Sequence, residues 1–417
     1  MPLPATSLVI VSRHREATLL RCLRGVAQMA HPCAELVVVA DPAACAAVRA
    51  SGIAAKVLEF DRPNISLARN LGIRAAAGEV VAFLDDDAVP EPTWLARLSA
   101  PFADPDVAAA GGWVRARNGF GWQWRAGTVD RLTRPGPLAA PADRTSLHRA
   151  TPGTAIEIKG VNCAYRRDLL LQIGGFDPEL AYYLDETELN LRLAARGALV
   201  AVVPDAVVHH FKAGSRQRSA RRVPVSLHDV GASTVVTLRR HGATPDETAA
   251  RLGTLAEEER AKLLRLMLRG DVEPRDVGRL LATLADGIAG ARSRALAPLV
   301  PLVPLPEAAR LQPLALPPRP GRVLCGRPLA WRRLRREARA CAAAGEVVTL
   351  IAMESSPRWH WMRYDGAGFW EQSGGVWGWS RREGPKVVSL RFASRAKLER
   401  GILSRFRPVG PILRQEL

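Results

Sequence analysis

The chain has 417 residues, and its 59 Lys and Arg against 41 Asp and Glu give a formal net charge of +18. At about 100–200 residues per domain, this length allows two to four domains. Apolar residues make up 47% and charged residues 24%, as in globular proteins, which excludes a largely disordered chain. A collagen-like chain and a small disulfide scaffold are excluded too, because there is no Gly-X-Y repeat and only 6 cysteines occur.

The basic excess is almost entirely arginine, which supplies 53 of the 59 basic residues. Such a bias, together with abundant Ala and Gly, follows from GC-rich coding alone. The net charge still favours polyanionic partners such as nucleotide phosphates, lipid phosphates or an acidic membrane surface. No basic stretch carries a recognised nucleic-acid-reading motif, so we expect no nucleic-acid partner.

The cysteines show neither a C-x-x-C pair nor the spacing of metal ligands, which is typical of small buried side chains in a reducing compartment. Residues 1–12 lack the basic start and long apolar core of a signal peptide. Apolar runs such as residues 36–40 are far shorter than the ~18 residues that span a bilayer. We therefore expect a cytoplasmic protein, at most peripheral at the inner face of the membrane.

The first ~215 residues alternate short β-branched runs with helical patterns. The run 80–84 is continuously apolar, like a strand buried on both faces of a parallel sheet. Gly78 is expected just past the end of the preceding helix. The alternation predicts a doubly wound α/β domain. Its expected strands are 8–11, 36–39, 55–60 and 80–84, and its expected helices are 16–29, 43–50 and 67–77.

The remaining chain divides into three parts, giving four units in all: an α/β domain at 1–242, a helical extension at 243–297, a linker at 298–321 and a small accessory domain at 322–417. Repeated prolines predict that the linker is stiff and extended. The last unit, with a strand at 322–325, a helix at 329–344 and a strand at 347–351, is expected to be α/β or α+β. It holds six of the ten tryptophans, which suit a carbohydrate platform or the core of a small domain.

Three adjacent carboxylates, Asp85, Asp86 and Asp87, follow the buried strand. Like charges this close resist ionisation unless a cation lies among them. Because side chains alternate along an extended segment, Asp85 and Asp87 are expected on one side and Asp86 on the other. Two oxygen donors at the carboxyl end of a parallel strand suit Mg²⁺ or Mn²⁺ held jointly with a diphosphate. The alternative is a solvated acidic turn before Pro90.

A series of motifs in a fixed order resembles family 2 glycosyltransferases, which are inverting enzymes of GT-A fold, over about residues 5–215. The resemblance implies a GT-A type, Rossmann-like doubly wound sheet. The motifs are Ser7-Leu-Val-Ile-Val-Ser-Arg-His-Arg, Glu35-Leu-Val-Val-Val-Ala-Asp, Asn64-Ile-Ser-Leu-Ala-Arg-Asn-Leu-Gly, the aspartate triplet, Lys159-Gly-Val-Asn-Cys-Ala-Tyr-Arg-Arg and Gly174-Gly-Phe-Asp-Pro-Glu-Leu.

The resemblance implies roles for individual residues. Asp87 falls on the metal ligand and Asp85 on the ribose contact, and Asp85 is also a candidate second metal ligand. Asp41 matches the residue that contacts the base, although Ala40 stands where the family usually has a further Asp. The remaining nucleotide-sugar contacts implied by the match are Ser12, Arg13, Arg69 and Asp86.

The catalytic base of the family, the Asp of a Glu-Asp pair, aligns with Glu186 in Asp185-Glu186. Glu186 is one methylene longer than the family's residue but can accept a proton in the same way, and Asp185 remains a second candidate. Acidic residues here also suit the first turn of a helix, where the dipole stabilises negative charge by about 0.3–1 kcal/mol. We expect Glu188 to be structural.

His209 and His210 follow an expected strand at 199–203 and an expected turn at Pro204-Asp205. His210 near a diphosphate suits a metal ligand or a phosphate donor, although a packed or solvated pair is the alternative. A basic run follows, which could close over a leaving diphosphate, rest on anionic lipid, or form a solvated loop. Its members are Lys212, Arg216, Arg218, Arg221 and Arg222.

The sequence thus predicts a metal-dependent inverting glycosyltransferase. It would use Mn²⁺ or Mg²⁺ and a nucleoside-diphosphate sugar, and its acceptor would be a saccharide or glycolipid in cell-surface polysaccharide or glycoconjugate synthesis. One alternative is a non-catalytic nucleotide-sugar or carbohydrate-binding module, suggested by Ala40 and Glu186. A sugar-phosphate nucleotidyltransferase is disfavoured, because Ser12-Arg-His-Arg has no glycine where that class needs a Gly-rich phosphate loop.

Overall fold

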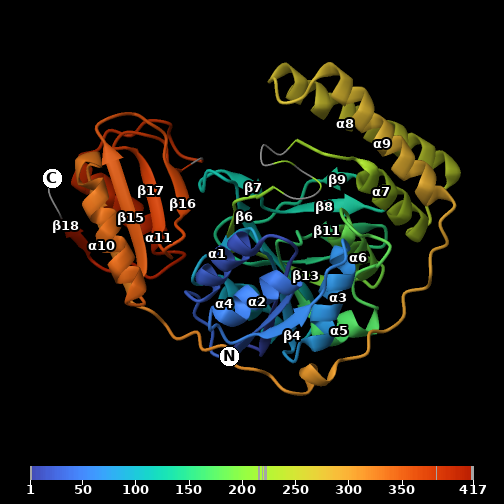
Figure 1. The fold of residues 1–417 in the computed structure, drawn as a ribbon, viewed down its shortest axis with the longest axis horizontal. Helices are drawn as coiled ribbons and strands as arrows, with labels where there is room; N and C mark the ends of the chain where they lie inside the picture. The colour runs from blue at the N-terminus through green and yellow to red at the C-terminus, as the bar shows by residue number, and fades with distance from the viewer. Residues whose placement is uncertain (1, 215–216, 218, 220–222, 382, 415–417) are drawn as a thin grey trace.

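The computed structural model describes residues 2–214, 217, 219, 223–381 and 383–414. A large mixed β-sheet with helices on both faces forms the centre (Figure 1). A group of long helices lies on one side of it and a smaller C-terminal unit on the other (Figure 1). None of the helices in the described ranges combines the length and the apolar composition needed to cross a membrane. All six cysteines are free thiols.

The central sheet has the strand order β10-β13-β6-β12-β4-β1-β2-β3, with β5 paired to β13 and β7 paired to β6. Strand β1 pairs in parallel with β2 and β4, whereas β12 runs antiparallel between β4 and β6. The predicted α/β class is confirmed, with a sheet that is mixed rather than purely parallel. The strands are β1 (Thr6–Ser12), β2 (Ala34–Ala40), β3 (Lys56–Glu59), β4 (Val80–Asp85), β5 (Ala88–Pro90), β6 (Val107–Arg115), β7 (Trp122–Trp124), β10 (Ser146–Arg149), β12 (Asn162–Arg166) and β13 (Leu199–His210).

Helices cover both faces of this sheet. In β1, Leu8 and Ile10 belong to one apolar core and Val9 to the other, as the alternation of a strand requires. Every residue of β2 is buried, because the strand is covered on both sides. One face is covered by α1 (Glu16–Val26), α2 (Pro42–Ala50), α4 (Trp94–Ser99) and the short 3-10 helix η1 (Ala100–Ala103), and the other by α3 (Ile65–Ala75), α5 (Arg167–Gln172) and α6 (Asp185–Ala194).

Two further layers extend this domain. A small antiparallel sheet consists of β8 (Gly127–Asp130), β9 (Pro135–Gly136) and β11 (Thr154–Glu157). Beyond it, a separate apolar core includes Leu238, Leu255 and Leu280. These three leucines come from α7 (His228–Arg240), α8 (Pro245–Leu268) and α9 (Pro274–Arg292). Thr244 and Glu247 form a capping box that starts α8, so the helical pattern predicted from residue 244 has a defined beginning.

The proline-rich segment is extended, as predicted, and passes along one edge of the central domain (Figure 1). The segment is also hydrogen-bonded to the central domain. The amide of Leu314 donates to the Ala34 carbonyl at 2.8 Å, and the amide of Gln312 donates to the buried carboxylate of Glu35 at 2.9 Å. Leu314 and Leu316 join the apolar core of the domain. The segment therefore holds the last unit against the first. It includes the short 3-10 helix η2 (Pro306–Ala309).

The C-terminal unit is a five-stranded sheet with the order β16-β17-β15-β14-β18, in which only the β16–β17 pair is antiparallel. Trp370 is completely buried in its core, whereas Trp359 and Trp377 are 54% and 40% exposed. The tryptophans thus serve partly as core and partly as surface. The elements are β14 (Gly321–Gly326), η3 (Pro328–Ala330), α10 (Trp331–Ala343), β15 (Val347–Glu354), β16 (Trp361–Tyr364), β17 (Trp370–Gly375), α11 (Phe392–Leu403) and β18 (Ile412–Arg414).

Two local predictions are wrong. Helix α3 ends at Ala75, so Gly78 does not cap it. Gly78 is instead needed for close packing, because a Cβ there would lie 2.6 Å from the backbone nitrogen of Ser7. The turn predicted at Pro204-Asp205 is also absent, since β13 continues through it as far as His210. A register shift between Val203 and Val207 accommodates the proline, which cannot donate to a ladder.

Candidate active site

A cavity of about 410 Å³ lies where β1 and β4 end. Because these parallel strands point the same way, the residues after them meet at one edge of the sheet. The cavity is lined by apolar residues together with polar and charged side chains, many of which belong to the predicted motifs. The lining includes Ser12, Arg13, Arg15, Asn64, Asp85, Asp86, Asp87, Gln123, Tyr182, His210 and Lys212.

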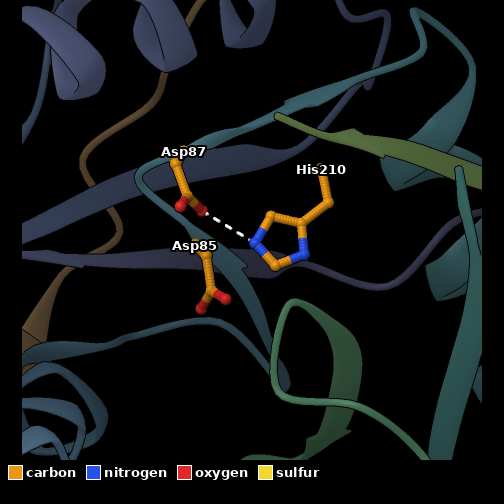
Figure 2. Close-up of side chains that lie close together, drawn as sticks. All are labelled: Asp85, Asp87 and His210. Carbon is orange, nitrogen blue, oxygen red and sulfur yellow. Dashed lines mark ion pairs between the residues drawn. The ribbon is translucent and has the colours of Figure 1, made fainter. Parts of the chain in front are cut away.

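Asp85, Asp87 and His210 form the centre of this site (Figure 2). Their ligand atoms all lie within 4.8 Å of one another, and His210 Nε2 is 3.0 Å from Asp87 Oδ1. Two strands that are distant in sequence make this contact. Strand β5 begins directly after Asp87 and pairs with β13, so that Ala88 lies opposite His210. The structure thus joins the predicted aspartates to the predicted histidine.

Asp86 is not part of this group of three, although it lines the same cavity. Strand β4 ends at Asp85, so Asp86 and Asp87 lie in a turn rather than in the extended segment that the predicted alternation assumed. Asp86 accepts a hydrogen bond from the Ser12 hydroxyl at 2.6 Å and pairs with Arg15 at 2.9 Å. Arg15 also reaches Asp87 at 2.6 Å. The sequence interpretation did not single out Arg15. A signal existed, since Arg15 is the N-cap of α1, where a cation faces the positive end of the helix dipole and needs nearby carboxylates.

The three carboxylates differ in their electrostatics. Burial raises the pKa of Asp86 to about 7 and also raises the pKa of Asp85, an effect that Arg69 opposes. Burial acts on Asp87 in the same direction, but His210 and Arg15 outweigh it and hold its pKa below the ordinary range. Burial thus opposes the simultaneous ionisation of all three carboxyl groups. A divalent cation would stabilise their ionised forms. Two carboxylates and one imidazole are a donor set that fits Mn²⁺ or Mg²⁺, and water and phosphate oxygens would complete the coordination.

Arg69 is buried and connects this cluster to the start of α6. Its guanidinium donates to Asp85 at 3.2 Å, to the Gly160 carbonyl at 3.3 Å and to Asp185. It also lies 5.1 Å from the ring centre of Phe176. Arg69 is therefore placed to position two carboxylates, and its predicted contact with the nucleotide stays a prediction.

Helix α6 begins in an unusual way. Tyr183 and Leu184 precede it with φ angles of 73° and 63°, in the left-handed region that costs a non-glycine residue about 1–2 kcal/mol each. This backbone sets Asp185 and Glu186 in the first turn. Burial raises the pKa of Asp185 to about 7, and its carboxylate is engaged with Arg69. Burial also opposes the charge of Glu186, but Lys159 and Arg69 outweigh it and lower the pKa of Glu186. Of the two carboxyl groups, Glu186 is the more exposed.

The remaining predicted residues lie around the loop after β1. Asp41 is buried and caps α2, accepting from the Ala44 amide at 3.2 Å and from the His14 amide at 2.7 Å. It thereby orders the loop that carries Ser12 and Arg13, while its contact with a base stays a prediction. Arg13 lines the cavity and its Nε donates to Asp61 at 2.7 Å.

The structure describes only part of the predicted basic run. Lys212 lines the cavity. Four members of the run lie outside the described residues, namely Arg216, Arg218, Arg221 and Arg222. Glu188, expected to be structural, pairs with Arg192 at 2.8 Å within α6.

His209 points into a buried contact between the two parts of the molecule. Its Nε2 is 2.8 Å from Glu91 Oε1, and Arg407 of the C-terminal unit donates its Nε to the other oxygen of Glu91 at 2.8 Å. The Arg407 guanidinium also lies 3.9 Å from the ring centre of Trp370. Because His209 precedes His210, this contact fixes the end of β13 next to the aspartate cluster. Sequence reasoning missed Glu91 and Arg407, whose separation by 316 positions leaves no local signal.

Comparison with known proteins identifies the family. A family model described as "Glycosyltransferase like family 2" matches residues 4–223. The chain belongs to this family. The match ends at residue 223, so the helices α7 to α9 and the C-terminal unit lie beyond the part of the chain that the family model covers.

Two curated relatives and one solved structure show how far the likeness reaches. The O-antigen biosynthesis protein RfbC of Myxococcus xanthus is 27% identical over 175 residues, 39% of this chain and 13% of that protein. The glucosyl-dolichyl phosphate glucuronosyltransferase of Haloferax volcanii is 30% identical over 123 residues, 27% of this chain and 34% of that protein. The chain thus matches about a third or less of each. A solved structure of GalNAc-T7 with UDP, GalNAc and Mn²⁺ aligns with a TM-score of 0.44 at 20% identity, covering 57% of this chain and 47% of that one.

The contact between Glu91 and Arg407 makes the stability of the fold sensitive to acid. Burial opposes the charge of Glu91, but Arg407 and His209 outweigh it and lower its pKa from 4.5 to about 2. A carboxylate with a lowered folded-state pKa stabilises the fold above pH 4.5, and this contribution is lost as the pH falls through about 2. Glu91→Gln should therefore lower the free energy of unfolding by about 3 kcal/mol at pH 7. Urea unfolding between pH 3 and pH 7 should show the difference from the unsubstituted protein shrinking towards acid. A pH-independent difference would contradict this assignment.

Proposed function

We propose that this family 2 glycosyltransferase is a metal-dependent inverting enzyme. It moves a sugar from a nucleoside-diphosphate donor to an acceptor hydroxyl. The observation that carries the proposal is the group of Asp85, Asp87 and His210 at the wall of the cavity, with ligand atoms within 4.8 Å of one another. A buried acidic group of this kind, facing a cavity at the carboxyl edge of a sheet, suits a cation bound together with a phosphorylated ligand.

Asp85, Asp87 and His210 would hold the divalent cation, Mn²⁺ or Mg²⁺. When bound, the ion would neutralise the charge that develops on the leaving diphosphate. The chain supplies further positive charge to the same cavity through Arg13, Arg15 and Lys212. Arg15 positions Asp87, because its guanidinium lies 2.6 Å from that carboxylate.

Glu186 would take the proton from the acceptor hydroxyl. A general base must be ionised and reachable, and Glu186 has a lowered pKa and partial exposure, whereas Asp185 is engaged with Arg69. Attack on the anomeric carbon from the face opposite the leaving diphosphate inverts its configuration. The acceptor is proposed to be a saccharide or glycolipid, and the names of the matched relatives, an O-antigen biosynthesis protein and a dolichyl-phosphate sugar transferase, support this class.

Peripheral contact with an anionic membrane is proposed for α10. Its residues Arg332, Arg336 and Arg339 are exposed, and Leu329 just before the helix is fully exposed. Residues 322–417 carry 19 Lys and Arg against 8 Asp and Glu. Each cation near such a surface contributes about 1 kcal/mol of attraction. Sedimentation with phosphatidylserine vesicles should weaken in R332E/R336E, and equal sedimentation of both proteins would contradict the contact.

Removal of the central carboxylate tests the reaction itself. Asp87→Ala should lower sugar transfer by at least about 100-fold, because the cation that stabilises the leaving group loses a ligand. The release of nucleoside diphosphate from UDP-, GDP- and dTDP-sugars measures transfer, and electron paramagnetic resonance of Mn²⁺ measures metal binding. Asp286→Ala, which removes an exposed carboxylate on α9, is the matched control. Full activity of Asp87→Ala, or activity undiminished by EDTA, would overturn the proposal. No transfer by the unsubstituted protein from any of these donors would favour a non-catalytic binding module.

A second experiment separates the two candidate bases. Glu186→Gln should lower kcat by about 100-fold or more while leaving the KM for the donor unchanged, since a base acts on the acceptor proton. Asp185→Asn should lower kcat less and should lower the melting temperature, because it disturbs the buried contact with Arg69. The opposite ranking of the two kcat values would assign the base to Asp185.

A further inference from the structure

A second and larger cavity separates the central domain from the C-terminal unit. It has a volume of about 890 Å³, large enough for several sugar residues. From the central domain it is lined by β6, β7 and the middle of β13, and from the other side by β16, the region around residue 380 and α11. We call this cavity the interdomain cleft. The family model ends at residue 223, so the second wall of the cleft lies outside the family domain.

Aromatic side chains form the central-domain wall of the cleft. Trp113 and Trp122 meet edge to face at 4.9 Å, and the guanidinium of Arg115 lies 3.4 Å from the ring centre of Trp122. Trp113 is only 5% exposed, so Trp122 is the ring of this pair that offers more surface to the cleft. The indole nitrogen of Trp122 donates to Glu383 of the C-terminal unit at 2.6 Å, and Glu383 also lines the cleft.

Basic side chains outnumber acidic ones in the lining of the cleft, where five Arg and Lys face Glu91, Asp205 and Glu383. Several of its cations are neutralised by carboxylates, such as Arg405, which lies 2.6 Å from Asp205. Arg381 and Lys397 also line the cleft, both are exposed, and neither has an ion pair with any residue that the structure describes. Such a surface favours a ligand that carries negative groups.

The short strand β7 separates the cleft from the cavity that holds Asp85, Asp87 and His210, which we call the catalytic cavity. Trp122 lines the cleft, while the next residue, Gln123, lines the catalytic cavity. Successive side chains of a strand point to opposite faces and are only ~3.3 Å apart along the chain. A ligand that fills the cleft therefore ends close to the cavity in which the donor is proposed to bind.

We propose that the interdomain cleft binds an anionic saccharide, namely a stretch of acceptor chain that carries carboxylate or phosphate groups. Its sugar rings pack on the aromatic wall, its acidic groups pair with Arg381 and Lys397, and its growing end passes over β7 to the catalytic cavity. The role of this saccharide as the acceptor rests on the proposed function. Its binding in the cleft does not, because it needs neither donor nor metal.

Calorimetric titration of the full chain, without metal or donor, tests this. Tetragalacturonate represents a carboxylated saccharide, maltotetraose a neutral one and inorganic phosphate a free anion. Tetragalacturonate should bind saturably and at least 10-fold more tightly than maltotetraose. The double variant R381E/K397E should raise its Kd at least 10-fold, whereas R332E/R336E, an equal double charge reversal on α10, should leave the Kd unchanged.

Several results would overturn the inference. They are the absence of saturable tetragalacturonate binding, an unchanged Kd in R381E/K397E, and equal affinity for maltotetraose. Competition by inorganic phosphate at equal concentration would reduce the site to one for free anions. Tighter binding of a single-stranded oligonucleotide than of tetragalacturonate would replace the saccharide with nucleic acid.

The same proteins separate this inference from the proposed function. Asp87→Ala should lose Mn²⁺ binding and sugar transfer but bind tetragalacturonate unchanged. R381E/K397E should bind Mn²⁺ and UDP like the unsubstituted protein. Loss of both abilities in R381E/K397E would contradict a separate cleft, whereas full transfer by Asp87→Ala would remove the metal-dependent reaction and leave the cleft in place.

Discussion

The site depends on one electrostatic constraint: three carboxylates lie side by side at the end of a buried strand. Their charges repel one another and lose hydration on burial, so they need positive charge from other parts of the chain. Arg15 reaches Asp86 and Asp87 from the start of α1, Arg69 reaches Asp85 from α3, and His210 reaches Asp87 from β13. The arrangement leaves Asp85, Asp87 and His210 together as the donors that fit a divalent cation.

Parts of the chain beyond the region that the family model matches contribute to the same arrangement. Arg407 of the C-terminal unit completes the buried contact of Glu91 with His209, the residue before His210. The proline-rich segment is held along its course, where Gln312 and Leu314 bond to the start of β2. The C-terminal unit therefore supports the end of β13 and forms the second wall of the interdomain cleft. Its proposed role is to hold the acceptor while the family domain holds the donor.

Much of the catalytic edge could be predicted because its signals are local. The continuous apolar run before Asp85-Asp86-Asp87 predicts a buried strand that ends in carboxylates, and the structure has this strand, with Asp86 and Asp87 in the turn that follows it. Asp185 and Glu186 open a helix, as their position before an amphipathic run indicates. The predictions for Gly78 and for Pro204 were wrong, because close packing against β1 and a bulge in β13 depend on neighbours distant in sequence.

By itself, the sequence determined the α/β class, the order of the family motifs and the carboxylates at the end of β4, since each depends on residues close together in the chain. Only the tertiary structure decided which cations meet those carboxylates and that β12 runs antiparallel between β4 and β6. It alone also revealed the buried pair of Glu91 with Arg407 and the cleft beside β7. These features depend on side chains that are separated by 16 to 316 positions in the chain, from Arg69 with Asp85 to Arg407 with Glu91, and the pairing that brings them together leaves no pattern within either segment.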